Sequence, residues 1–250
     1  MSPKVDWHAR YAQQARWTEE VRSHLAQTLK FQQAQRILEA GCGTGVITRW
    51  LHEVTTARIF GLDIECSNIS RAAKFDGQSL FACADVHFSP FASQSFDITL
   101  CHFLLLWVAN PLSSLKEMVR VTKKGGYVLA LAEPDYGGRI DYPPELSRLG
   151  ELQRASLKDA GADPLIGRQL ACLFRRAGLM NVHTGLLGGN WHQVPSAAER
   201  EMEWAVLLSD IGERLPADEL ETLKALDGRA WQDGCRILFI PTFYAWGQVA

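Results

Sequence analysis

Apolar and polar positions follow one another along the chain in a way that predicts strands and helices in turn. Between residues 36 and 133, five short apolar runs are separated by turns and by segments with apolar residues three and four positions apart. This pattern is typical of parallel strands joined by helices. It predicts an α/β fold with a doubly wound, mostly parallel sheet.

Helical and strand patterns continue on both sides of this region. Before it, the apolar spacing predicts a helix over residues 7–30. After it, the pattern predicts helices over 145–160 and 167–177, a strand over 179–187, two amphipathic helices within 195–233 and a last strand over 235–246.

A glycine-rich turn follows the first apolar run. Ile37, Leu38 and Ala40 are followed by glycine at positions 41, 43 and 45, and the helical pattern then begins. Glycine lets a chain reverse tightly and lets its backbone approach a ligand. A dinucleotide-binding turn, G-x-G-x-x-G/A, needs glycine or alanine where Val46 stands. The pattern present is E-x-G-x-G-x-G, beginning at Glu39.

This motif resembles the first motif of class I S-adenosylmethionine-dependent methyltransferases. Four further strand-and-turn segments follow in the family's order. The second and third strands end in Asp63 and Asp85, and residues 95–102 look like the family's fourth motif. An amphipathic helix, Gly125-Gly126 and a buried strand complete the series. The resemblance covers residues 36–133. It implies a seven-stranded Rossmann-like sheet with an N-terminal helical lid and a helical insertion before the last strand.

The resemblance also implies roles for residues around the turn. Glu39 would help to hold the cofactor's ammonium, Asp63 the ribose hydroxyls and Asp85 the adenine amine. The full set of expected cofactor contacts is Tyr11, Trp17, Glu39, Gly41, Cys42, Gly43, Gly45, Asp63, Ile64, Asp85, Val86, Cys101 and His102. The expected cofactor is S-adenosylmethionine and the product S-adenosylhomocysteine. Aromatic rings suit a sulfonium, because their faces attract cations.

Several of these residues have alternative interpretations. Asp63 can instead cap the helix that follows it, and Tyr11 and Trp17 can be core anchors. His102 is the leading candidate for a catalytic base, because it titrates near neutrality and sits at the carboxyl end of a strand. Packing would explain it as well. Tyr136 and Asp135 are weaker candidates, and none is a base if proximity alone drives the reaction.

The segment after the fifth strand is the most promising place for substrate contacts, because loops at the carboxyl ends of strands form the mouth of such a sheet. Residues 133–144 combine acids, aromatics, an arginine and glycines, although an ordinary connection would also fit. The residues expected to face the substrate are Trp107, Tyr136, Arg139 and Tyr142.

Composition sets the outer limits of these hypotheses. The 250 residues, 47% of them hydrophobic, suit one methyltransferase domain over 1–250, with a lid (1–30), a cofactor-binding core (31–135) and substrate-side helices and closing strands (136–250). A net charge of −2 argues against a nucleic-acid partner. The six cysteines have no zinc-like spacing and are expected to be buried and reduced; no metal is expected. We expect a cytoplasmic monomer or homodimer without a membrane span.

Three functions are compatible with these observations. The first is a methyltransferase that moves a methyl group to a small-molecule acceptor, resembling the ubiquinone and menaquinone biosynthesis type. A nicotinamide-dependent oxidoreductase is disfavoured by Val46. The third is a non-catalytic S-adenosylmethionine-binding protein of the same fold.

Overall fold

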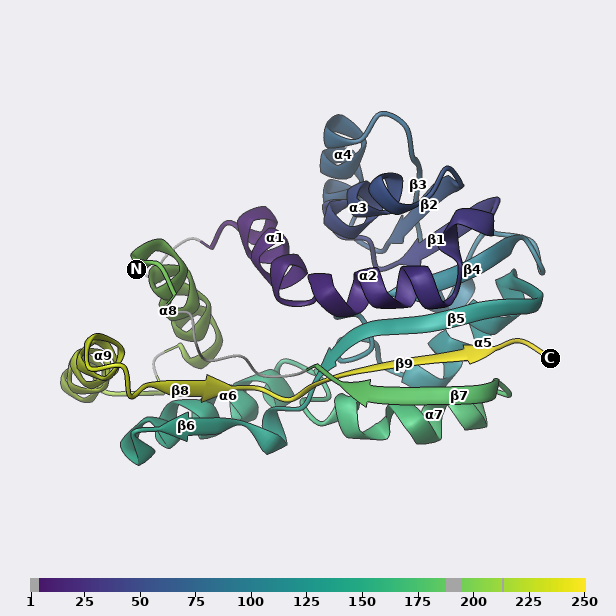
Figure 1. The fold of residues 1–250 in the computed structure, drawn as a ribbon. Helices are drawn as coiled ribbons and strands as arrows, with labels where there is room; N and C mark the ends of the chain where they lie inside the picture. The colour runs from purple at the N-terminus through teal and green to yellow at the C-terminus, as the bar shows by residue number, and fades with distance from the viewer. Residues whose placement is uncertain (1–4, 188–194, 213) are drawn as a thin grey trace.

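The computed structural model describes residues 5–187, 195–212 and 214–250, and its centre is a twisted seven-stranded sheet (Figure 1). The strand order is β3-β2-β1-β4-β5-β9-β7. The first five of these strands are mutually parallel, and β9 runs antiparallel to both of its neighbours, β5 and β7. The predicted doubly wound, mostly parallel sheet is confirmed.

The elements of the sheet lie close to the predicted positions. The strands are Arg36–Ala40 (β1), Arg58–Asp63 (β2), Leu80–Cys83 (β3), Phe96–Cys101 (β4), Thr122–Pro134 (β5), Met180–Leu186 (β7) and Thr242–Gln248 (β9). The flanking helices are Val46–Val54 (α3), Cys66–Phe75 (α4), Pro111–Val121 (α5) and Leu170–Arg176 (α7), with short 3₁₀ turns at Val86–Phe88 (η2) and Ile166–Gln169 (η5).

Residues between β4 and the next helix are not helical. Residues 102–110 instead form turns, and α5 begins at Pro111. The Asn110 side chain accepts a hydrogen bond from the backbone N–H of Ser113 at 3.0 Å and so caps the helix. Proline is favoured in the first helical turn, where its missing N–H costs nothing.

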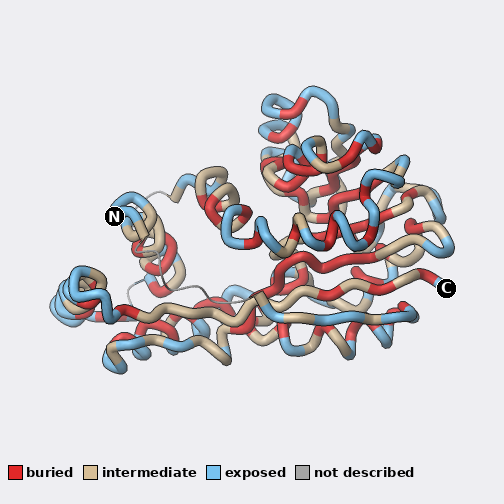
Figure 2. Tube along the Cα trace, viewed as in Figure 1, coloured by how far each residue is buried: buried red, intermediate tan, exposed pale blue. Residues whose placement is uncertain are grey.

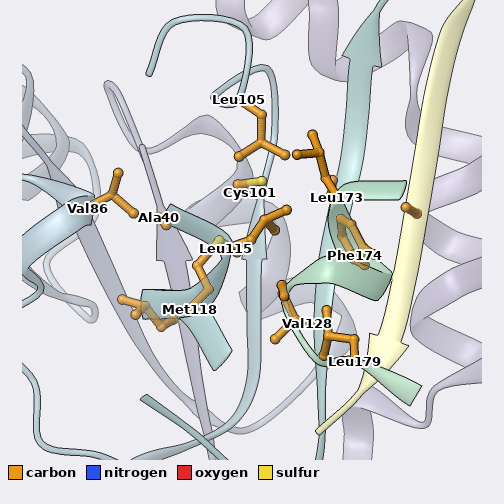
Figure 3. Packing of buried hydrophobic residues seen from close by; sticks show 14 of the residues in the cluster. Ala40, Val86, Cys101, Leu105, Leu115, Met118, Val128, Leu173, Phe174 and Leu179 are labelled. Atoms are coloured by element: carbon orange, nitrogen blue, oxygen red, sulfur yellow. The ribbon is translucent and has the colours of Figure 1, made fainter. Parts of the chain in front are cut away.

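Two apolar clusters cover the two faces of the sheet. Neighbouring residues of a strand point to opposite faces, so Leu38 joins the cluster against α5 and α7, and Ile37 joins the cluster against the N-terminal helices and α3. Figure 3 shows the first of these clusters, in which Leu115 and Phe174 pack beside the sheet. In Figure 2 the buried residues gather in the strands and on the helix faces turned toward them.

The predicted N-terminal helix consists of two helices, Trp7–Trp17 (α1) and Glu19–Thr28 (α2), followed by a 3₁₀ turn at Phe31–Gln33 (η1). The break falls at Thr18. Leu25 of α2 belongs to the same buried cluster as Trp50 of α3, so this segment packs on the sheet as a covering layer. We call α1 and α2 the lid. Residues 1–4 of the predicted lid lie outside the described residues.

A separate apolar cluster lies beyond one end of the sheet (Figure 1). It joins three helices, Ser147–Asp159 (α6), Ala197–Ile211 (α8) and Ala217–Gln232 (α9), next to a two-stranded sheet of Ile140–Tyr142 (β6) and Ile237–Phe239 (β8). We call these elements the cap. Short 3₁₀ turns lead into it at Tyr136–Gly138 (η3) and Pro144–Leu146 (η4). The predicted helical insertion before the last strand is confirmed.

The predicted last strand over 235–246 is wrong in one respect, because it forms two strands. β8 ends at Phe239 and pairs with β6, whereas β9 begins at Thr242 and enters the main sheet. Pro241 lies between them. Proline has no N–H for a strand ladder, and this accounts for the interruption.

The prediction of six buried, reduced cysteines is wrong for four of them. Cys66 and Cys83 form a disulfide that links the start of α4 to the end of β3. Cys172 and Cys235 are free but exposed, and only Cys42 and Cys101 are free and buried. Sequence spacing could not reveal the disulfide, because the two half-cystines meet only when β3 pairs with β2. A cytoplasmic location stays a prediction.

The described residues also bear on two properties, membrane crossing and metal binding. None of the helices in the described part of the chain combines the length and the apolar character that a membrane crossing needs. Within the same residues, His, Cys, Asp and Glu side chains do not gather in groups of three or more that would hold a metal ion.

Candidate cofactor and active site

The chain leaves β1 through a turn in which every second residue is a glycine with left-handed backbone. The angle φ is +70° at Gly41, +51° at Gly43 and +82° at Gly45. Side chains rarely tolerate these angles. Space is also short, because a Cβ at Gly41 would lie 2.6 Å from the side chain of Leu104. The turn therefore exposes bare backbone at the carboxyl end of the central strand.

The lid lies directly on this turn. A Cβ at Gly43 would be 3.2 Å from the Tyr11 ring, and Nδ1 of His8 lies 2.8 Å from the hydroxyl of Thr44. Tyr11 is thus brought to the turn, where the sequence analysis expected it. Trp17, the last residue of α1, is different: its ring is 51% exposed, and the Arg10 guanidinium lies over its face at 4.7 Å.

Asp63, the last residue of β2, points its carboxylate at the glycine turn. Its Oδ2 accepts a hydrogen bond from the backbone N–H of Gly43 at 2.7 Å, and its Oδ1 accepts one from Glu65 at 2.9 Å. The N-cap of α4 is Glu65, so the alternative of a helix cap explains neither bond. Because each carboxylate oxygen has two lone pairs, both oxygens can accept a further hydrogen bond.

An apolar and acidic rim continues from Asp63 along the neighbouring strands. The Ile64 side chain is 65% exposed, which is unusual for a large aliphatic residue beside a buried strand. Asp85 follows β3, and its Oδ1 accepts from the backbone N–H of His87 at 2.9 Å. Val86 is buried beside it. The sheet order β3-β2-β1 brings these residues and the glycine turn to one edge.

Glu39 has a different position from the one its expected role requires. Its carboxylate is buried, and the Thr48 hydroxyl of α3 donates a hydrogen bond to it at 2.5 Å. Burial raises the pKa of Glu39 to about 8, with Asp63 adding to the effect and the Thr48 bond opposing it. The side chain ties β1 to α3 beneath the turn. A contact between Glu39 and the ammonium of a cofactor stays a prediction.

His102 and Cys101 lie at the carboxyl end of β4. Nε2 of His102 lies 3.0 Å from the hydroxyl of Thr18, at the break in the lid. Burial and the nearby Arg22 guanidinium lower the pKa of His102 to about 3. An imidazole with this pKa is a weak proton acceptor at neutral pH, and the role of His102 as a catalytic base stays a prediction. The Cys101 thiol is buried, and burial raises its pKa.

Arg22 is a buried cation between the lid and the sheet. Its Nη2 donates to the carbonyl of Ala15 at 2.7 Å, its Nε donates to Thr18 at 3.1 Å, and its guanidinium stacks on Trp50 at 4.4 Å. Its Nη1 is buried and has no hydrogen-bond partner among the residues that the structure describes. An unpaired buried donor of this kind needs an explanation, and a ligand acceptor supplies one.

Glu133, near the end of β5, organises the loop after β4. Its carboxylate accepts three backbone hydrogen bonds, from Leu104 at 3.0 Å, Leu105 at 2.8 Å and Leu106 at 3.2 Å. The residue is fully buried. Burial raises the pKa of Glu133 to about 8, against the effect of the three N–H donors. The loop that carries His102 therefore depends on a side chain from the next strand.

Tyr136 and Arg139 lie where the sheet meets the cap. Burial, with the Asp210 carboxylate nearby, raises the pKa of Tyr136 to about 12. Arg139 donates to Asp141 at 2.7 Å and to Gln153 at 2.5 Å, so its charge is paired inside the protein. Both residues line a cavity of about 200 Å³ between η3 and α6. Asp135, the other base suggested by the sequence, is buried and paired with Arg168.

The other two expected substrate residues are not gathered with them. The Trp107 side chain is 53% exposed in the loop before α5, and Tyr142 is 51% exposed on β6. A contact of either residue with the substrate stays a prediction.

An ion pair joins the lid to the cap at this place. The Arg10 guanidinium of α1 contacts the carboxylate of Glu203 on α8 and donates to the Gln13 side chain at 2.8 Å. Arg10 and Gln13 are buried, although both are polar. An outer pair joins Arg16 to Glu199 at 3.4 Å. Lid and cap thus meet at these two ion pairs.

Four of these residues were not predicted from the sequence as part of the site: Arg10, Gln13, Arg22 and Glu133. Only Glu133 left a signal, because an acid in the apolar run Leu129–Pro134 must be paired when that run is buried. The other three lie in the polar helices α1 and α2, where no sequence pattern distinguishes them from surface residues. Their burial depends on partners far along the chain.

The doubly wound sheet, the glycine turn after β1 and the carboxylates after β2 and β3 define a class of α/β proteins that bind a nucleoside cofactor at the carboxyl ends of the strands. Residues 38–130 match the family described as methyltransferase domain. The ubiquinone/menaquinone biosynthesis C-methyltransferase UbiE of Desulfotalea psychrophila is 30% identical over 179 residues, which is 63% of this chain and 73% of that protein. The chain belongs to the class I S-adenosylmethionine-dependent methyltransferase family, whose members are enzymes.

Other similar proteins agree with this assignment. The malonyl-[acyl-carrier protein] O-methyltransferase of Hamiltonella defensa is 28% identical over 119 residues, covering 48% of this chain and 46% of that protein. The chain spans about half the length of the first curated relatives it matches. The YcgJ protein of Bacillus subtilis has the same fold, with a TM-score of 0.61 at 16% identity, over 92% of this chain and 98% of that one.

Proposed function

We propose that the chain binds S-adenosylmethionine at the carboxyl ends of β1 to β4, beneath the lid, and methylates a small-molecule acceptor held between lid and cap. The observation that carries the proposal is the Asp63 carboxylate, which lies 2.7 Å from the Gly43 amide nitrogen at the glycine turn. An acid at this end of the second strand suits a ribose diol.

The residues around the turn fit this cofactor. The exposed Ile64 side chain offers an apolar surface to adenine, and Asp85 offers an acceptor to its amine. The unpaired Nη1 of Arg22 would suit the methionine carboxylate, because a charged acceptor satisfies a buried guanidinium. Tyr11 would cover the turn from the lid side. The contacts to ribose and adenine would also suit NAD, and the oxidoreductase alternative is disfavoured by Val46 in the glycine turn.

The cofactor, when bound, supplies a methyl group that its sulfonium has already activated. The chain's own part is to align the acceptor and to exclude water. Tyr136 is positioned as a hydrogen-bond donor, because its raised pKa keeps the phenol neutral. His102 is a poor base, and Asp135 is occupied by Arg168. We therefore propose alignment of the acceptor, without a dedicated base, as the main source of rate.

A small acceptor is supported by the buried contact between lid and cap. The Arg10–Glu203 pair holds α8 against α1, and both Arg10 and Gln13 are buried there. A polymer would need an open groove in their place. Two matched relatives are named for quinone biosynthesis and for malonyl-[acyl-carrier protein]. These names are compatible with a ring or an acyl group as the acceptor.

Calorimetry with S-adenosylhomocysteine, S-adenosylmethionine and NAD tests the cofactor. We expect both adenosyl ligands to bind and NAD not to bind, and we expect Asp63→Ala to weaken S-adenosylhomocysteine at least about 30-fold through lost charge-assisted hydrogen bonds. Asp159→Ala, on an exposed ion pair, is the control. Equal binding of NAD, or full affinity in Asp63→Ala, would contradict the proposal.

The acceptor requires a separate measurement. Release of S-adenosylhomocysteine is followed with panels of phenols, quinols and carboxylates, and at least one panel should give turnover. If the cofactor binds and no small acceptor is methylated, while a protein or nucleic acid is, the acceptor half of the proposal is wrong.

A further inference from the structure

Three side chains form a hydrogen-bonded row behind the proposed adenine position. Nδ1 of His87 lies 2.7 Å from Oδ1 of Asp85, and Nε2 of the same ring lies 3.1 Å from the hydroxyl of Ser114. The first two residues belong to the η2 turn after β3, whereas Ser114 belongs to α5. The row therefore links a half-exposed acid to a serine with 0% exposure in the protein core.

The chemistry of the three groups fixes the direction of the row. An ionised carboxylate only accepts hydrogen bonds, so Nδ1 of His87 carries a proton and donates it to Asp85. In the neutral ring Nε2 is then an acceptor, and the Ser114 hydroxyl is its donor. The carbonyl oxygen of Asn110 lies 3.3 Å from both Nε2 and the hydroxyl, and it serves as acceptor if Nε2 is protonated. In either state the ring is held at both nitrogens.

Both N–H groups of His87, one from the backbone and one from the ring, reach the same oxygen of Asp85. The distances to Oδ1 are 2.9 and 2.7 Å, respectively. Oδ2 accepts no hydrogen bond from any described residue, and the side chain is 38% exposed. The carboxylate is thus locked in rotation with one oxygen left for a ligand. A simple cap of the three-residue η2 turn would need only the backbone bond.

We infer that His87 and Ser114 are positioning residues that aim Oδ2 of Asp85 at the exocyclic amine of adenine. The inference rests on the proposed function, since it assumes an adenosyl cofactor at this edge. It adds that selectivity for the amine depends on Ser114, which no cofactor atom touches. Preorganised partners of this kind act by holding a first contact in its productive geometry.

The experiment compares two ligands by calorimetry, S-adenosylhomocysteine and its analogue with purine riboside in place of adenosine, which lacks only the amine. Wild type should bind the first about tenfold or more tightly, as expected for a hydrogen bond to a charged acceptor. Ser114→Ala should reduce this ratio to about threefold by weakening S-adenosylhomocysteine alone. The matched control is Ser113→Ala, on the exposed side of the same helix, which should keep the wild-type ratio.

A second variant keeps the test independent of folding at the buried serine. His87→Phe removes both ring nitrogens from a side chain that is 17% exposed and should also reduce the ratio, whereas His87→Asn, which retains a donor near Nδ1, should restore part of it. Equal weakening of both ligands by Ser114→Ala and His87→Phe would mean a merely structural role and would overturn the inference. A wild-type ratio near one would overturn it too, while leaving the cofactor assignment intact. Failure of wild type to bind either ligand would refute the proposed function itself.

Discussion

The hydroxyl of Thr18 lies 3.0 Å from Nε2 of His102, although 84 positions separate the two residues. Thr18 is the point at which the lid breaks between α1 and α2, and His102 directly follows β4. The Nε atom of Arg22 donates to the same hydroxyl at 3.1 Å. The break in the lid is thereby fastened to the sheet edge where the methionine part of the cofactor is proposed to lie.

This contact predicts a dependence of stability on pH. The pKa of His102 is about 3 in the folded chain and near the ordinary 6.5 when unfolded. Below pH 6.5 the unfolded chain therefore binds a proton that the folded chain does not, and stability falls with pH down to about 3. Between pH 7.5 and 5.5 this group should cost about 1 kcal/mol of unfolding free energy. Urea unfolding at the two values measures it.

His102→Gln is the control for other titrating groups, because its amide can accept from Thr18 and does not titrate. The loss between pH 7.5 and 5.5 should be smaller in this variant than in wild type by the same amount. An identical loss in both proteins would show that His102 is protonated in the folded chain.

The ion pair between lid and cap predicts the effect of removing one charge. Glu203→Gln leaves the Arg10 guanidinium, whose side chain is only 8% exposed, without its anion. We expect a loss of about 2 kcal/mol in unfolding free energy, below the range for a fully buried pair because Glu203 is 32% exposed. Affinity for S-adenosylhomocysteine should also fall, since α1 loses its anchor on α8.

Glu199→Gln is the matched control for this change. It acts on the outer pair with Arg16, whose side chains are 37% and 58% exposed, and glutamine preserves the capping box of α8. We expect a change within about 0.5 kcal/mol. If both variants lose stability equally, the inner pair does not fasten the lid.

Glu133→Gln should disturb the loop after β4. Oε1 accepts hydrogen bonds from the backbone N–H groups of Leu104 and Leu105, and Oε2 accepts one from Leu106. The amide of glutamine would have to turn its NH₂ group toward at least one of these N–H donors. At about pH 9, above the Glu133 pKa of about 8, the side chain is ionised; there we expect a loss of about 2 kcal/mol in unfolding free energy, together with weaker binding of S-adenosylhomocysteine. Glu221→Gln, on the exposed surface of α9, serves as control and should change neither. Wild-type stability in Glu133→Gln would refute the organising role.

The disulfide predicts a dependence of stability on redox conditions. Cys66 and Cys83 lie 17 positions apart, and closing a loop of this size stabilises a fold by about 3 kcal/mol in the chain-entropy model. The unfolding free energy of Cys66→Ser should be lower than that of wild type by this amount. A thiol reductant should destabilise wild type but not the variant. Cys172→Ser, at an exposed free thiol, should behave as wild type. Insensitivity of wild type to the reductant would exclude the bond.

The sheet could be predicted because its determinants are local. Apolar runs such as Ile37–Ala40 and glycines with obligatory left-handed backbone announce a strand and a turn within a few residues. The acids at the ends of β2 and β3 were also found in this way, by position alone. The same reasoning placed the carboxylate of Asp63 correctly at the glycine turn.

The remainder depends on partners distant in sequence. Arg10 is buried against Glu203, which lies 193 positions away in the sequence. The lowered pKa of His102 depends on its burial in the fold and on the nearby Arg22 guanidinium. Glu39 was assigned to the ligand from its motif, yet Thr48 holds it in the interior. Trp107 and Tyr142 are about half exposed, and whether either faces the substrate depends on contacts that the sequence does not display.

Strands β7 and β9, which precede and follow the α8, α9 and β8 part of the cap along the chain, pair directly in antiparallel fashion. Between them the chain makes an excursion through α8, α9 and β8 and returns to the place it left. The excursion can therefore be regarded as the very long connection of a hairpin. Its length and content can be exchanged without re-routing any strand, so different acceptors can be accommodated over an unaltered nucleoside-binding edge.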